Sequence, residues 1–104
     1  MILRRRRFAD VISRQLDLFE QDHAGLLRDV VAAEEAYDRA GRGEGEERYG
    51  DYLDLVETAA ELLAELRDGF ARTLDEPADE EYELAFNRAV AKRFPRLAVA
   101  IGEA

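Results

Sequence analysis

The sequence predicts an all-α protein, built from a long antiparallel helical hairpin and a shorter C-terminal helix. Two observations carry this prediction. Apolar residues recur every three or four positions over residues 4–40 and again over residues 46–74, which is the spacing of one helix face. A glycine-rich segment, residues 41–45, separates the two runs and offers several left-handed positions for a turn. A chain of 104 residues has the usual size of a single domain.

The first helix is expected over residues 4–40. Its apolar stripe consists of Phe8, Ile12, Leu16, Phe19, His23, Leu26, Val30, Ala33, Tyr37 and Ala40. Gly25 interrupts this helix at a cost of about 1 kcal/mol relative to alanine. Because the stripe continues without a shift on both sides of Gly25, we prefer one continuous helix, and a break within residues 22–25 is the alternative.

The second helix, over residues 46–74, is expected to have a wide apolar face made of two neighbouring seams. One seam holds Tyr52, Leu55, Ala59, Leu62 and Leu66, and the other holds Leu53, Val56, Ala60, Leu63 and Phe70. The opposite side is acidic, with Asp54, Glu57, Glu61, Glu65 and Asp68. Pro77 favours the start of a third helix over residues 77–94, and Pro95 begins a short last helix over residues 95–101.

The lengths of these helices predict self-association. At 1.5 Å per residue the first two helices are roughly 55 and 43 Å long, whereas the third is only about 25 Å long. The third helix is therefore too short to cover the hairpin, and an apolar strip would stay in water. We expect a homodimer in which two hairpins form a four-helix bundle. The expected interface residues are Phe8, Ile12, Leu16, Phe19, Leu26, Val30 and Tyr37.

The composition excludes several classes of function. The formal net charge is −9, from 24 acidic and 15 basic residues, so most of the surface would repel nucleic-acid phosphates and anionic membranes. There is no cysteine, which excludes disulfides, thiolate metal sites and cysteine nucleophiles and makes the cytoplasm the expected location. Ser13 is the single serine, so the chain offers few side chains that could act as a catalytic nucleophile, and we do not expect an enzyme.

His23, the single histidine, is the main candidate for chemistry. Glu20 and His23 have the Glu-x-x-His spacing that lets one helix offer a carboxylate and an imidazole to one metal ion, and Glu34 follows on the adjoining flank. The acidic residues of the second helix point away from its apolar face, so they do not complete such a site. We therefore favour a structural histidine that contacts a carboxylate or a carbonyl over a ligand of a divalent metal ion.

A basic cluster, Arg4, Arg5, Arg6 and Arg7, stands at the beginning of the chain. It could bind an anion such as a phosphate, but positive charge is unfavourable at a helix start, so ion pairs with acidic residues are the preferred interpretation. The sequence thus favours a non-enzymatic interaction or scaffold protein, without a cofactor, that associates with itself or with a protein partner. A metal-binding or sensing bundle around Glu20, His23 and Glu34 is the alternative, and an anion-binding accessory protein is a weaker one.

Overall fold

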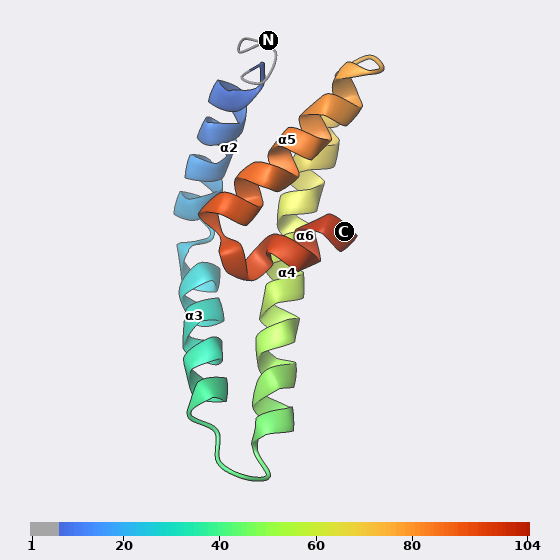
Figure 1. Ribbon diagram of the computed structural model, residues 1–104. Coiled ribbons are helices and arrows are strands. Elements are labelled where there is room, and N and C mark those ends of the chain that lie inside the picture. The colour runs from blue at the N-terminus through green and yellow to red at the C-terminus, as the bar shows by residue number, and fades with distance from the viewer. Residues whose placement is uncertain (1–6) are drawn as a thin grey trace.

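The computed structural model describes residues 7–104, and every regular element in this part of the chain is a helix (Figure 1). The molecule measures 51 × 24 × 23 Å along its principal axes. Its α-helices are α2 (Ala9–Asp22), α3 (Ala24–Asp38), α4 (Gly45–Ala71), α5 (Ala78–Arg93) and α6 (Ala98–Glu103), and a short 3₁₀ helix, η1 (Pro95–Leu97), precedes α6. The all-helical fold predicted from the apolar spacing is confirmed.

The predicted hairpin is formed by α2 and α3 on one side and the long helix α4 on the other (Figure 1). Residues 39–44 connect α3 to α4, and Gly43 has a φ of +96°, a conformation that glycine adopts without the steric cost of a side chain. Val30 of α3 and Val56 of α4 are buried between the two helices. The glycine-rich segment therefore makes the turn that the sequence predicted.

The preferred continuous first helix is wrong and the alternative, a break within residues 22–25, is confirmed, because the helix breaks at His23. This residue ends α2 and begins α3, with φ −124° and ψ 30°, outside the helical region. Helical hydrogen bonds persist on both sides, from the His23 N–H to the Phe19 carbonyl and from the Leu27 N–H to the His23 carbonyl. Gly25, two residues later, favours a bend of this kind. The apolar stripe survives because a single residue leaves the helix.

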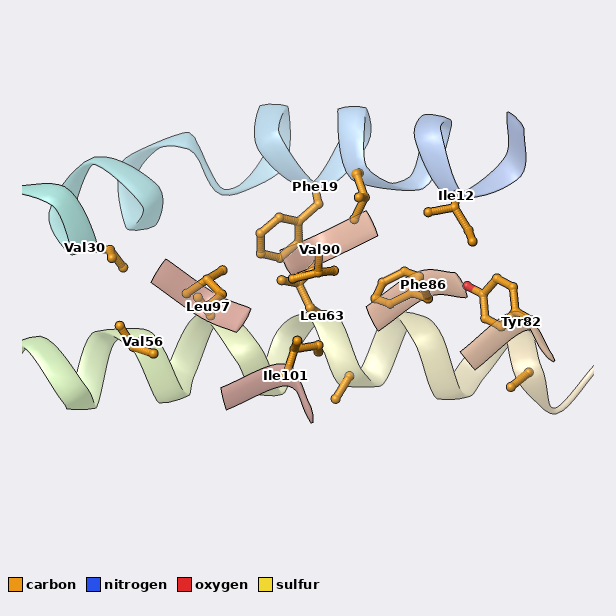
Figure 2. Packing of buried hydrophobic residues seen from close by; sticks show 14 residues of the cluster. Ile12, Phe19, Val30, Val56, Leu63, Tyr82, Phe86, Val90, Leu97 and Ile101 are labelled. Atoms are coloured by element: carbon orange, nitrogen blue, oxygen red, sulfur yellow. The ribbon is translucent and has the colours of Figure 1, made fainter. Parts of the chain in front are cut away.

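The C-terminal elements pack against one side of the hairpin. In Figure 1 α5 runs from the end of α4 toward the end of α2, and α6 crosses the middle of α4. Figure 2 shows the core that results, with side chains from α2, α3 and α4 meeting side chains from α5, η1 and α6. Tyr82, Phe86, Val90, Leu97 and Ile101 are the buried contributions of the C-terminal part, each at most 1 % exposed.

This packing corrects the residues predicted for a dimer interface. Four of the seven lie in the core of the single chain, where Ile12, Leu16, Phe19 and Val30 are 1 to 4 % exposed. Helix lengths alone do not reveal that α5, η1 and α6 together cover the stripe at these four residues. These four side chains are therefore unavailable to a second molecule in this fold.

One charged side chain, Arg67 of α4, is buried with the core. Its guanidinium donates hydrogen bonds to the Asn87 side chain of α5 and to the main-chain oxygens of Ile101 and Ala104. It also donates to the carboxylate of Asp68, at 2.8 Å. Arg67 thus joins α4 to both C-terminal α-helices.

Among residues 7–104, no helix combines the length and the apolar character that crossing a membrane requires.

Candidate interaction surfaces

The two seams predicted for α4 have different surroundings in the structure. Val56, Ala60 and Leu63, from one seam, are buried beneath the C-terminal elements. In the other seam Ala59 is fully buried, whereas Leu55, Leu62 and Leu66 are partly buried. Leu66 lies about 100° around the helix from Arg67, which contacts α6, so this second seam lies to one side of the surface that contacts α6. The acidic side is as predicted, and Asp54, Glu57, Glu61 and Glu65 are exposed.

Apolar residues with a similar position occur on α2 and α3. On α2, Leu18 is 57 % exposed and lies about 160° around the helix from Glu20, which contacts α5 through Arg93. Val11 lies two turns before Leu18 on the same side and is partly buried. On α3, Leu26 is partly buried and lies about 80° around the helix from Glu34, which contacts Arg96 of η1.

Helix geometry places these residues toward the side of the hairpin away from α5 and α6. We name this surface the hairpin face, and it consists of Val11, Leu18, Leu26, Leu55, Leu62 and Leu66. Leu26 is the one member that the sequence had also placed at an interface. On α2 and α4, an offset of one residue from the buried stripe is the signal that could have found the others, since the second seam of α4 has this offset.

The structure does not gather Glu20, His23 and Glu34 into one site. Glu20 accepts a hydrogen bond from Arg93, at 2.9 Å, and Glu34 accepts one from Arg96, at 2.7 Å. The His23 ring packs against Phe19, with 4.8 Å between the ring centroids. Within residues 7–104, no three histidine, cysteine, aspartate or glutamate side chains are arranged to hold a metal ion. The two carboxylates therefore act as partners of arginines that tie the C-terminal elements to the hairpin.

These ion pairs raise the pKa of the two arginines. The hydrogen bond to Asp17 is the largest cause of a raised pKa for Arg93, and the bond to Glu34 does the same for Arg96. Glu34 also accepts a hydrogen bond from the Tyr52 hydroxyl, at 3.4 Å. Burial, followed by the charge of Glu34, raises the pKa of Tyr52. All these shifts favour the protonated arginines and tyrosine, so they stabilise existing contacts rather than prepare a proton transfer.

Of the predicted basic cluster, Arg4, Arg5 and Arg6 lie outside the described residues. Arg7 lies with its Nη1 atom 3.5 Å from a carboxylate oxygen of Glu81 in α5, and its guanidinium is 5.1 Å from the centre of the Phe8 ring. The one described member of the cluster is thus engaged within the chain.

Tyr37, the last residue predicted for the interface, belongs to an aromatic cluster at the turn of the hairpin. Its ring centroid is 5.2 Å from that of Tyr49, which is 6.4 Å from that of Tyr52. Tyr37 and Tyr49 are each about two-fifths exposed. Phe8, at the other end of the stripe, packs edge-on against Tyr82.

Searches of protein-family models, curated proteins and solved structures find no match to this chain. A function can therefore be inferred only from the surfaces themselves.

Proposed function

We propose that the protein is a non-catalytic helical interaction protein that self-associates through the hairpin face. The observation that supports this is the exposed Leu18 of α2, together with partly buried apolar side chains of α2, α3 and α4 that helix geometry places on the same side, away from α5 and α6. A bundle of helices buries apolar seams on its inner sides, so a further layer of helices would complete the burial of these side chains. A second copy of the chain supplies that layer with the same surface, as in most symmetric dimers.

The size of the molecule fits this proposal. Its long face measures 51 × 24 Å. Contact over about two-thirds of such a face buries roughly 800 Å² per copy, which is the area of a standard specific interface. The hairpin face supplies an apolar centre for that area, and charged side chains lie along its edges, as is usual for interfaces.

Charges at these edges favour one orientation of the two copies. Arg14 flanks the hairpin face on α2, and Glu61 and Glu65 flank it on α4, about 100° around the helix from Leu62 and Leu66 respectively. A twofold axis parallel to the helices places α2 of one copy against α4 of the other. In that arrangement facing helices run antiparallel, and Arg14 meets the acidic edge of the second copy.

Light scattering on the purified protein tests the proposal. We expect a mass of two chains of 11.8 kDa at micromolar concentration. Leu18→Glu should give a monomer that keeps its helical circular dichroism, because this side chain is 57 % exposed in the single chain and its replacement leaves the core intact. Leu84→Glu is the matched control, since Leu84 is 61 % exposed on α5, away from the hairpin face.

A monomeric wild-type protein would contradict the proposal. So would an equal loss of dimer in the Leu84→Glu control, because the effect would then come from added charge rather than from the hairpin face.

A further inference from the structure

A groove runs between α2 and α5, on the opposite side of α2 from the hairpin face, and has a volume of about 930 Å³. All the residues that line it belong to these two helices, so it has two walls and an open front. The walls are bridged by ion pairs near both ends of the helices. Arg7 approaches Glu81 near the first turns, and Arg93 contacts Asp17 at 2.6 Å near the last turns.

Small side chains keep the groove open. Ala9 and Ser13 line it from α2, and Ala85 and Ala89 line it from α5, in each case one helical turn apart. Ile12 and Leu16 form its floor and are already almost fully buried. Such a trough accepts the ridge of another helix. It does not enclose a small molecule, because ligand pockets surround most of the ligand surface.

The α5 wall carries three cations with different surroundings. The guanidinium of Arg93 is held by Asp17 and Glu20 of α2. Arg88 and Lys92 line the groove one turn apart and are exposed, and no carboxylate of the described residues lies within 4.0 Å of either. In a chain with a net charge of −9, this pair marks a local positive edge.

We infer that the groove between α2 and α5 binds an amphipathic helix of a partner protein that carries acidic residues one turn apart beside its apolar stripe. The apolar stripe packs on the small residues of the two walls, which is the helix-in-groove mode of recognition. Carboxylates at positions i and i+4 of the partner match the one-turn spacing of Arg88 and Lys92. Glu61 and Glu65 beside the second seam of α4 have this spacing, but in a second copy that seam belongs to the proposed dimer interface, so we assign the groove to a different protein.

Binding of two synthetic peptides tests this inference. The first, of about 18 residues, has a leucine and alanine stripe flanked by glutamates at i, i+4 spacing, and the second has the same composition in scrambled order. Fluorescence anisotropy of the labelled peptides measures affinity for the full chain. We expect the ordered peptide to bind, to shift the amide resonances of Ser13 and Ala89, and to bind about tenfold or more tightly than the scrambled peptide.

Charge-reversal variants distinguish peptide binding in the groove from general electrostatic attraction to the protein. The double variant Arg88→Glu with Lys92→Glu should weaken binding of the ordered peptide by about tenfold or more. Arg39→Glu with Arg42→Glu makes the same change in net charge at the turn of the hairpin and should have little effect. Ala89→Trp fills the groove from within and should also abolish binding.

Three results would overturn the inference. They are equal binding of the ordered and scrambled peptides, equal loss in the two double variants, and saturable binding of decanoate in the groove without binding of either peptide. The proposed dimer is tested by Leu18→Glu, which does not touch the groove, so the two proposals can fail separately.

Discussion

Arg67 and Asn87 are joined by a hydrogen bond of 3.0 Å from the guanidinium Nη1 to the side-chain oxygen, between α4 and α5. The same guanidinium donates to the main-chain oxygens of Ile101 and Ala104, at 3.3 and 3.0 Å. Since Arg67 is only 6 % exposed, these bonds are made where water competes poorly. One buried arginine therefore fixes the C-terminal layer that leaves the hairpin face as the open side.

The first prediction concerns this arginine. Arg67→Ala should lower the free energy of unfolding by about 2–4 kcal/mol, because it leaves buried acceptors on α5 and α6 without donors and creates a cavity. Urea denaturation followed by circular dichroism measures the change.

Arg72→Ala is the control for this prediction. Arg72 is exposed and lies five residues after Arg67, just beyond α4, so its replacement should change the free energy of unfolding by about 0.5 kcal/mol or less. Similar effects of the two variants would show that the Arg67 hydrogen bonds contribute nothing specific.

Much of the fold could be predicted from the sequence, because apolar spacing, glycine and proline act locally. The turn at residues 41–45 and the two seams of α4 are examples. The break at His23 was harder to predict from the sequence, since the apolar stripe continues through it and only the backbone changes. The burial of Arg67 could not be predicted from the sequence either, because its hydrogen-bond acceptors come from residues 20 to 37 positions later in the chain.

The residues predicted for a metal site show the same limit of prediction from sequence. Glu20 and Glu34 have spacing compatible with a metal site around His23, yet each is contacted by an arginine of the C-terminal part, Arg93 or Arg96. Periodicity shows which face of a helix is apolar, but it does not show which distant element covers that face. For this reason the surface left open could be located only once α5 and α6 were in place.

The second prediction concerns pH and Tyr82. This residue is fully buried, and its hydroxyl donates to the Gln15 side chain at 2.8 Å. Burial is the largest cause that raises the pKa of Tyr82 above its ordinary value of 10.0. Since the folded state disfavours tyrosinate, its contribution to stability is complete below pH 10 and is lost as pH rises through the folded pKa.

Thermal unfolding between pH 7 and 11.5 measures this effect. The melting temperature of the wild type should fall above about pH 10. Tyr82→Phe should lower the melting temperature near neutral pH, because it removes the hydrogen bond to Gln15, and should make the alkaline decline shallower. Tyr37→Phe, at a partly exposed tyrosine, is the control and should leave the alkaline decline unchanged. Parallel pH profiles of the wild type and Tyr82→Phe would contradict the prediction.

The third prediction tests the orientation of the proposed dimer by exchanging charges. Arg14 on α2 and Glu65 on α4 flank the hairpin face, and both are exposed in the single chain. If α2 of one copy lies against α4 of the other, Arg14→Glu alone and Glu65→Arg alone should each weaken the dimer by about 0.5–1 kcal/mol for every ion pair removed. The double variant restores opposite charges across the interface and should recover the wild-type dissociation constant.

Sedimentation equilibrium at low ionic strength measures the dissociation constants, because salt screens edge charges. The exchange of Arg28 with Glu57 is the matched control, since both side chains are exposed on α3 and α4 but lie away from the hairpin face. Recovery in the Arg14 and Glu65 double variant requires the two residues to meet between copies, because within one copy the row of apolar side chains separates them. Additive weakening in that double variant would exclude the orientation with α2 against α4, whereas Leu18→Glu still tests whether the hairpin face is the interface.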